Sequence, residues 1–574
     1  MSDMLVLSLV LIALLCGLIR NKVSPAILFI LASFFCYLVG IGSFESLVNG
    51  FSNNGLLVLT LLLLCSIALE KTPMLSIMGK IIGNGSLPLC IARLGFSAAL
   101  LSSFTNNTAV VASMISAVRR NTSHAPSKLL LPLSYCAILG GTLTLIGTST
   151  NLIVNAFVVD ANLPPIGFFE FTQIGLMLVV SGVMLLMLLC RWLPNRNRIE
   201  NQVSQMYFFE AKVAKDSPLI NKTVQENGLK GLKQVYLVEV ERNDVHVHPA
   251  SPRMKLQAGD LLRFSGVIEA VELLQQFKGL EWFDEQQVKG QSIVEAVLSA
   301  SSSLIGSNLK ESAFREQFDA VVMGVRRGHF RLRGSLGDIK LMAGDVLLLA
   351  PGENFGDKGQ LRTDFAAISG LDLSVRIDGK KSTGILVGFI SVIALNLMGI
   401  FPIEKGLLIY LLLNILLGTI SLREIRRRFP VVLVVIVGCA LFIAKLMLET
   451  GLANLLSNGI LWVFDGYGVY GAFIAVYFLT LILTELITNN ASAALAFPIA
   501  YAISINYGVD PRPFIMAVIF GASASFISPY GYQTNLMVFS AGDYEVKDYL
   551  KIGVPLSIMY SLISLAAIPI FFPF

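Results

Sequence analysis

Charged residues are distributed very unevenly along this chain of 574 residues, and the distribution limits the folds that it can adopt. Residues 191–381 hold 50 of the 81 Asp, Glu, Lys and Arg side chains, whereas all other residues together hold 31. A soluble globular domain typically carries about 25% charged residues throughout. The distribution therefore predicts two apolar blocks, 1–190 and 382–574, joined by a soluble insert, 191–381, and it excludes a single soluble globule.

Several classes of function are not expected from this composition. The net charge is only +5, and no concentrated basic region indicates a surface for nucleic acid. The sequence contains no arrangement of a nucleophile with a base and no phosphate-binding loop, so we do not expect an enzyme. No G-x-G-x-x-G motif follows a predicted strand, so we expect no NAD site and no other organic cofactor.

The two apolar blocks are long enough for several membrane-spanning helices, each of which needs about 20 apolar residues. The predicted spans are 4–19, 26–42, 55–70, 129–157 and 168–190 in the first block, and 382–399, 405–420, 429–447, 511–540 and 552–573 in the second. The first of these lacks the basic start and the cleavage site of a signal peptide, so we expect it to be a membrane helix.

Two further apolar stretches, 87–118 and 468–505, are each interrupted by a polar cluster. The clusters are Thr105-Asn106-Asn107-Thr108 and Thr488-Asn489-Asn490. A straight membrane helix would leave these side chains in lipid without partners, whereas a re-entrant hairpin buried in protein places them at a tip that lines a cavity. We therefore expect about five spans and one re-entrant hairpin in each block.

The polar sequences recur with matching spacing in the two blocks. Thr105-Asn106-Asn107 precedes Thr150-Asn151-Leu152 by 45 residues, and Thr488-Asn489-Asn490 precedes Thr534-Asn535-Leu536 by 46. Because the number of spans in each block is odd, the second block lies inverted relative to the first, and the two hairpin tips meet near the middle of the membrane. The predicted fold is a polytopic α-helical membrane protein built from two inverted repeats.

The positive-inside rule predicts the orientation of this fold. It places both termini outside and the insert, which opens with Arg191, Arg196 and Arg198, in the cytoplasm. We therefore expect a multi-pass protein of a bacterial cytoplasmic membrane.

The insert contains a repeat of its own, with an offset of 85 residues. Lys255-Leu-Gln-Ala-Gly-Asp-Leu261 aligns with Lys340-Leu-Met-Ala-Gly-Asp-Val346, and each segment lies between two runs typical of β-strands. The two copies, about 205–280 and 290–365, predict small α+β modules that resemble the TrkA-C domain, the C-terminal half of the regulators of potassium conductance. The resemblance implies a structural or dimerising role, with binding of a small nucleotide as the alternative.

The chemistry of the chain is expected at the polar clusters inside the apolar blocks. Hairpin tips expose carbonyl, amide and hydroxyl oxygens that can coordinate Na⁺, and the N-termini of broken helices favour an anion. Neither tip contains Lys or Arg, which fits an anion held by helix dipoles, hydroxyl groups and bound cations. The alternative is that these side chains only join membrane helices through hydrogen bonds.

Four segments resemble motifs of the divalent anion/sodium symporter family. Ser102-Ser-Phe-Thr-Asn-Asn-Thr-Ala109 and Thr484-Glu-Leu-Ile-Thr-Asn-Asn-Ala491 are similar to its paired Ser-Asn-Thr motifs. Gly147-Thr-Ser-Thr-Asn-Leu-Ile153 and Ser528-Pro-Tyr-Gly-Tyr-Gln-Thr-Asn-Leu536 are similar to the unwound segments that complete its two half-sites. The resemblance covers both apolar blocks, although Asn106 stands where the family has Ser and the second tip reads Thr-Asn-Asn-Ala.

The resemblance implies specific roles for individual residues. The implied substrate-binding residues are Asn106, Asn107, Thr108, Thr148, Thr488, Asn489, Asn490 and Pro529. The implied ligands of Na⁺, the coupling ion, are Ser102, Asn107, Gly147, Thr148, Thr484, Thr488, Asn490 and Ser528. Supporting roles behind these residues are expected for Glu485, Asn151 and Asn535.

The function implied is sodium-coupled symport of a small divalent anion by an elevator-type movement. We expect sulfate as the substrate, ahead of a C4-dicarboxylate or citrate, and we expect a homodimer surrounded by membrane lipid. The alternative is a cation channel or a cation/proton antiporter regulated by the TrkA-C-like modules. Against it, the spans show neither a filter-like carbonyl loop nor a chain of acidic residues beyond Glu485.

Overall fold

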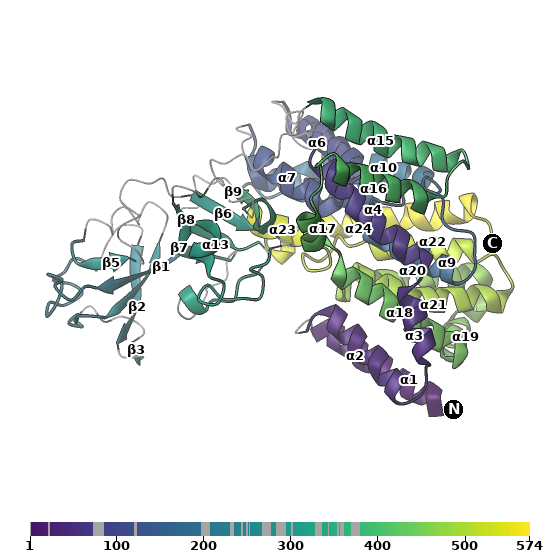
Figure 1. The fold of residues 1–574 in the computed structure, drawn as a ribbon, viewed down its shortest axis with the longest axis horizontal. Coiled ribbons are helices and arrows are strands. Elements are labelled where there is room, and N and C mark those ends of the chain that lie inside the picture. The colour runs from purple at the N-terminus through teal and green to yellow at the C-terminus, as the bar shows by residue number, and fades with distance from the viewer. Residues whose placement is uncertain are drawn as a thin grey trace.

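The computed structural model consists of a large helical unit and a smaller β-rich part that extends from one end of it (Figure 1). It describes residues 2–20, 23–72, 85–119, 123–196, 207–229, 235–242, 245–247, 251, 253–266, 277–282, 294–299, 302–327, 336–342, 344–352, 355, 361–368 and 379–574. Parts of both predicted modules, among them 267–276 and 328–335, lie outside the described residues.

The helical unit is formed by both ends of the chain. The helices before the insert are α1 (Ser2–Arg20), α2 (Pro25–Leu38), α3 (Phe44–Phe51), α4 (Asn54–Glu70), α6 (Leu87–Ser102), α7 (Asn107–Arg119), α8 (Leu130–Gly141), α9 (Ser149–Asp160) and α10 (Thr172–Leu189). Those after it are α15 (Gly379–Leu397), α16 (Ile403–Leu416), α17 (Leu422–Arg428), α18 (Val431–Glu449), α19 (Leu452–Phe464), α20 (Gly468–Leu486), α21 (Asn489–Tyr507), α22 (Arg512–Ser523), α23 (Gln533–Ala541) and α24 (Val546–Phe571).

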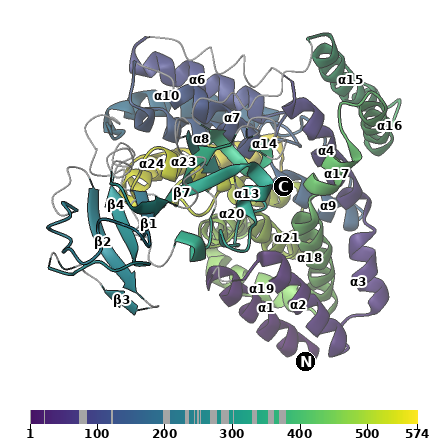
Figure 2. The ribbon, with the colours of Figure 1, turned by 60° about the vertical axis from the view of Figure 1, so that its left-hand side comes forward.

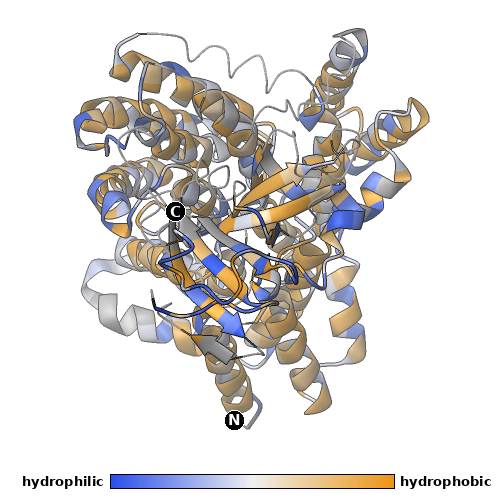
Figure 3. Cartoon of the chain, turned by 90° about the vertical axis from the view of Figure 1, so that its left-hand side faces the viewer, coloured by the Kyte–Doolittle hydropathy of each residue, from blue (hydrophilic) through white to orange (hydrophobic). Residues whose placement is uncertain are grey.

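Length and apolar composition identify this unit as a multi-pass membrane domain. Six segments of the described chain are long and apolar enough to cross a bilayer. They are Asp3–Arg20, Phe44–Glu70, Thr172–Trp192, Val431–Glu449, Gly468–Leu486 and Val546–Phe571. Hydrophobic residues dominate the helices in Figure 3, whereas the strands of the insert mix hydrophobic and hydrophilic residues.

Two predicted spans are wrong as continuous helices. The span predicted at 129–157 is divided into α8 and α9 by an irregular segment at 142–148, and the span predicted at 511–540 is divided into α22 and α23 at 524–532. Within the first break, Gly147 allows the chain to pass close to the end of α8, because a Cβ atom at this position would lie only 2.8 Å from the Cα atom of Gly141. The short helices α3, α17 and α19 lie between the predicted spans and were not expected.

Helix contacts follow one scheme in both halves of the unit. α6 packs on α8 as α20 packs on α22, and α7 packs on α23 as α21 packs on α9. Farther from these helices, α4 packs on α16 as α18 packs on α2. Every helix in these pairs therefore has a counterpart in the other half that makes the equivalent contact.

The described part of the insert forms short antiparallel strands together with a few short helices. These are β1 (Tyr207–Val213), β2 (Val235–Arg242), β3 (Val245–Val247), β4 (Leu261–Gly266), β5 (Leu280–Trp282), β6 (Val294–Leu298), α13 (Phe314–Phe318), β7 (Ala320–Arg326), β8 (Val346–Pro351), α14 (Leu361–Asp364) and β9 (Phe365–Ile368). Described strands join in the order β3-β2-β4-β1-β7-β8-β6-β9, with β5 also paired to β1. The order β2-β4-β1 in one half of the sheet thus matches β7-β8-β6 in the other.

An ion cluster at β1 connects the two halves of the sheet. The guanidinium group of Arg263 is almost fully buried and donates a hydrogen bond of 2.7 Å to Glu210 on β1, and it also pairs with Glu239 and Glu241. Glu210 accepts a second bond, of 3.0 Å, from the backbone N–H of Leu336.

Figure 2 shows β7 and α13 near the helical unit and β2 and β3 at the far edge of the sheet.

Candidate functional site

Both predicted polar clusters interrupt the helices that contain them. α6 ends at Ser102 and α7 begins at Asn107, while α20 ends at Leu486 and α21 begins at Asn489. The new helices are capped by the polar residues themselves, because Asn106 Oδ1 accepts from the N–H of Thr108 at 2.9 Å. Thr488 Oγ1 caps α21 in the same way, accepting from the N–H of Ala491 at 3.4 Å. Asn and Thr favour such positions, so the sequence directs a helix to start here.

The two irregular segments beside the clusters are held by equivalent asparagine side chains. Asn151 Nδ2 donates to the carbonyl groups ten and seven residues earlier, those of Gly141 and Thr144, at 3.2 and 3.0 Å. Asn535 Nδ2 makes the same pair of bonds, at 3.0 and 3.3 Å, to the carbonyl groups ten and seven residues before it. Each buried amide therefore donates to two carbonyl groups at or after the point where its helix is interrupted.

The first polar cluster contacts the start of α23, in the other half of the chain. Asn107 Nδ2 donates to the hydroxyl of Tyr532 at 2.7 Å, and the same hydroxyl lies 3.2 Å from Thr148 Oγ1. Thr108 Oγ1 donates to Gln533 Oε1 at 3.3 Å. The starts of α7, α9 and α23 are therefore joined by side-chain hydrogen bonds.

The second polar cluster contacts the start of α9. Ser149 Oγ donates to Asn490 Oδ1 at 2.9 Å. Because Ser149 follows Thr148 directly, both clusters meet the same end of α9. Four helix N-termini, those of α7, α9, α21 and α23, thus converge on one group of neutral polar side chains. Each helix N-terminus carries a partial positive charge.

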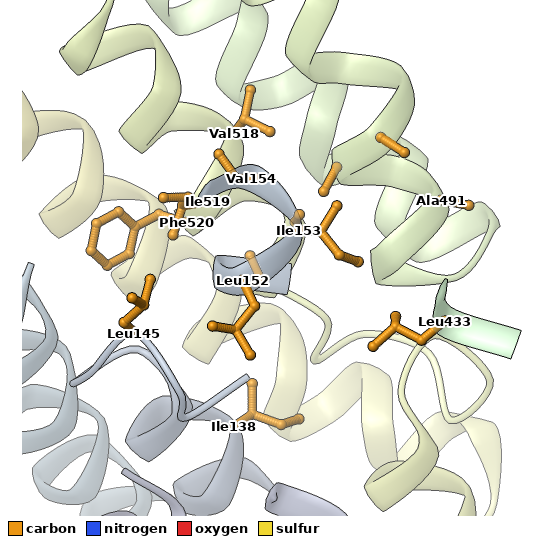
Figure 4. Packing of buried hydrophobic residues seen from close by; sticks show 14 of the residues in the cluster. Ile138, Leu145, Leu152, Ile153, Val154, Leu433, Ala491, Val518, Ile519 and Phe520 are labelled. Atoms are coloured by element: carbon orange, nitrogen blue, oxygen red, sulfur yellow. The ribbon is translucent and has the colours of Figure 1, made fainter. Parts of the chain in front are cut away.

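Apolar packing fixes the position of α9 behind this group. Leu152, Ile153 and Val154 of α9 are buried, and they lie among buried side chains of α8, α18, α21 and α22 (Figure 4). The labelled neighbours are Ile138, Leu145, Leu433, Ala491, Val518, Ile519 and Phe520. A short helix of 12 residues is stable here because nearly all of its surface is buried.

Glu485 holds the irregular segment between α22 and α23. Its carboxylate accepts backbone N–H bonds from Phe526 and Ile527 at 3.0 Å each, and from Ser528 at 3.1 Å. The preceding residue, Thr484, donates to the carbonyl group of Ala522 at 2.8 Å. Three N–H donors stabilise the ionised form of a carboxylate, which burial in an apolar environment otherwise disfavours.

Several buried oxygens near these segments have no hydrogen-bond partner within the described part of the chain. They are Asn151 Oδ1 in the first half, and Ser523 Oγ and Ser525 Oγ in the second. A buried oxygen of this kind costs free energy unless another group binds it.

The remaining predicted site residues lie next to these contacts. Ser102 donates a hydrogen bond to Asn107, Gly147 lies in the segment before α9, and Ser528 accepts from the N–H of Tyr530 at 3.1 Å. Asn489 and Pro529 are buried, whereas Asn106 and Thr488 are exposed at the start of their helices.

The sequence interpretation missed three residues of this group: Ser149, Tyr532 and Gln533. Ser149 and Gln533 each stand two residues before the asparagine that holds their segment, Asn151 or Asn535. This common spacing was a signal that could have identified them.

A family model for citrate transporters matches residues 7–521 and 429–574 of the chain. The chain belongs to this family. Members of the citrate transporter family are transporters, which confirms the prediction that the protein is not an enzyme. The membership also agrees with the resemblance to anion transporters that the four sequence motifs indicated.

Relatives of this citrate transporter family member include proteins of Chlamydomonas reinhardtii, Synechocystis and Escherichia coli. The putative sulfur deprivation response regulator of Chlamydomonas reinhardtii is 31% identical and covers 97% of this chain and 99% of its own length. The probable sodium/sulfate cotransporter 3 of the same alga is 29% identical over 64% of this chain and 42% of its own length. Among solved structures, the YdaH transporter of Alcanivorax borkumensis aligns over 92% of this chain and 87% of its own, with 12% identity and a TM-score of 0.42, which is too low to establish a common fold.

Proposed function

We propose that this member of the citrate transporter family is a sodium-coupled symporter of a small divalent anion, with sulfate as its substrate. The observation that supports the proposal best is the convergence of four helix N-termini on Asn107, Thr148, Ser149 and Asn490. An anion bound there accepts N–H bonds from helix ends, as at other helix N-termini. The name of the relative that is called a probable sodium/sulfate cotransporter supports sulfate.

Sodium has a specific task in this proposal. The two tip sequences, 102–109 and 484–494, contain no Lys or Arg, so helix dipoles and bound cations supply the positive charge. Asn151 Oδ1 and Ser525 Oγ, buried oxygens that have no hydrogen-bond partner among the described residues, support one cation position in each half. Binding of Na⁺ first would raise the affinity for the anion, and the reciprocal effect follows from linkage.

The architecture in this proposal is that of two inverted repeats. The equivalent helix contacts in the two halves, and the identical bonding of Asn151 and Asn535, support a repeat of 1–190 in 382–574. The same proposal makes 191–381 a cytoplasmic insert of two TrkA-C-like modules in a bacterial cytoplasmic membrane. The matching strand orders β2-β4-β1 and β7-β8-β6 support the duplication within it.

Transport in this proposal is an elevator movement of one group of helices against another. The moving group comprises the helices around the site, α6 to α10 and α20 to α24, and the fixed group comprises α1, α2, α4, α15, α16 and α18. Exposed apolar side chains on α2 and α16, such as Leu31 and Leu412, support contact with lipid or with a second subunit of a homodimer.

Uptake of radiolabelled sulfate into proteoliposomes tests the proposed function. We expect uptake under an inward Na⁺ gradient and little uptake when choline or K⁺ replaces Na⁺. A competition panel of unlabelled sulfate, thiosulfate, succinate and citrate then assigns the anion, and we expect sulfate to compete best. Equal uptake with all three cations would overturn sodium coupling, and displacement by citrate alone would overturn sulfate.

A further inference from the structure

The two halves of the insert contain the same rigid turn. In the first, Arg242 donates to both carboxylate oxygens of Asp260 at 2.7 Å, and Asp260 accepts the N–H of Gln257 at 2.8 Å. In the second, Arg327 makes the same two bonds to Asp345, again at 2.7 Å. A bidentate arginine pair of this kind fixes geometry, so both turns are rigid.

The surroundings of the two turns differ completely. Gly259 and Gly344 precede the two aspartates and have nearly the same backbone angle, with φ of +86° and +84°. Around Gly259, no atom of the described residues, apart from Gly259 and its two neighbours in the chain, lies within 4 Å of the position that a Cβ atom would occupy. At Gly344 the same position lies 3.3 Å from Ser540 Oγ and 3.7 Å from the carbonyl oxygen of Leu536. The second turn therefore rests on α23, while the first is open.

A second contact joins this half of the insert to the site. Strand β9 lies against α7, the helix that begins at Asn107. Helix α23 begins at Gln533, and Ser540 follows seven residues later, about 10 Å along the helix at 1.5 Å per residue. The second half of the insert thus touches two of the four helices whose N-termini form the candidate site.

The chain connections explain why this contact matters. The insert leaves the helical unit after α10, which packs on α6 and α24, and returns at α15, which packs on α16 and α4. It therefore links the helices around the site to the group proposed to stay fixed.

We propose that the turn at Gly344 and strand β9 form a releasable brake that holds α23 and α7 when docked and leaves them during each transport cycle. This inference rests on the proposed function, because it assigns a regulatory contact to that same site. The docked surface is one turn and one short edge strand. The identical open turn at Gly259 supplies a matched control within the same chain.

A reversible disulfide between the turn and α23 tests the brake. The Cβ position at Gly344 lies 3.6 Å from Ser540 Cβ, within the 3.5–4.5 Å range of disulfides, so the full-length Gly344→Cys/Ser540→Cys variant is suitable. Gly259→Cys/Ser540→Cys is the control, because it places the same substitution on a nearly identical backbone angle without the contact. Disulfide formation is measured by mass spectrometry, and sodium-driven uptake of labelled sulfate is measured before and after oxidation.

We expect the disulfide to form in the Gly344 variant and to lower uptake at least tenfold, with recovery after reduction. We also expect saturating Na⁺ and sulfate to slow disulfide formation, because transport separates the two surfaces. Full uptake by the oxidised variant would overturn the brake, and so would failure of the disulfide to form. If the native protein takes up no sulfate under any Na⁺ gradient, the proposed function fails, while the ligand dependence of disulfide formation, measured with other anions, still tests the contact.

Discussion

The side-chain amide of Asn107 donates a 2.7 Å hydrogen bond to the hydroxyl of Tyr532, although 425 residues separate them in the sequence. A second long-range bond, from Ser149 to Asn490, crosses the halves in the same way. Each polar tip is therefore completed by the irregular segment or helix start of the opposite half. In the proposed function, a substrate bound at this place would contact both halves at once, which is the geometry that alternating access about a shared site requires.

Replacing either tip asparagine is expected to abolish transport. In Asn107→Ala or Asn490→Ala, the amide that joins the two halves is lost, and we expect labelled sulfate uptake to fall at least tenfold. The control is Asn506→Ala at the far end of α21. It removes a hydrogen bond of 3.0 Å from Asn506 to Ser457 of α19. Near-normal uptake in both tip variants, with folded protein recovered in normal yield, would assign these asparagines to helix packing alone.

Neutralising Glu485 is expected to weaken sodium coupling. Hydrogen bonds to charged groups contribute about 1.5–3 kcal/mol each, and Glu485 receives three from residues 526–528. In Glu485→Gln this segment loses its fixed position, so we expect the Na⁺ concentration for half-maximal uptake to rise at least tenfold. Glu449→Gln, at the exposed end of α18, serves as the control. An unchanged sodium curve would contradict the role of Glu485.

Removal of the Tyr532 hydroxyl is expected to break the hydrogen-bonded connection between Asn107 and Thr148. Tyr532→Phe keeps the ring but leaves a buried donor without its acceptor, at a cost of about 1–3 kcal/mol. We expect sulfate uptake to fall about tenfold at subsaturating sulfate, with the melting temperature of the purified protein lowered only slightly. Tyr530→Phe is the control, since Tyr530 is 62% exposed. Loss of thermal stability without loss of uptake would show that the hydroxyl is structural.

Loss of Arg263 is expected to unfold the insert. Arg263→Met leaves Glu210, Glu239 and Glu241 without their shared cation, and breaking a buried ion pair costs about 3–5 kcal/mol. We expect proteolysis within 191–381 to become at least tenfold faster. The control Lys310→Met removes an ion pair that is more than half exposed, for which about 0–1 kcal/mol is expected. Equal protection in both variants would contradict the importance of the buried cluster.

The helix breaks at Asn106 and Thr488 could be predicted from sequence, because polar side chains within an apolar stretch have few alternatives to a break inside protein. The breaks at 142–148 and 524–532 were not predicted from hydropathy, which treated 129–157 and 511–540 as single spans, although Gly147, Pro529 and Gly531 lie within the two breaks. They depend on Asn151 and Asn535, whose side chains replace helical bonds from ten residues away. Only the resemblance to unwound segments indicated them.

The role of Tyr532 lay beyond sequence reasoning for a different reason. A tyrosine at the start of a short helix has no sequence feature that separates it from other aromatic residues of membrane proteins. Its two partners come from the other end of the chain.

The contact between the second half of the insert and α23 also could not be predicted from sequence, because the turns at Gly259 and Gly344 have almost the same sequence. Only tertiary structure distinguishes the docked turn from the open one.

The hydrogen bonds between the two halves also constrain how the protein is made. The first tip leaves the ribosome more than 400 residues before Tyr532 and Gln533, the partners of its Asn107 and Thr108. In the proposed inverted-repeat topology, the first hairpin would enter the membrane before the residues that complete its hydrogen bonds are made. Translation of the insert would then separate these two events, the entry of the first hairpin and the arrival of its partners.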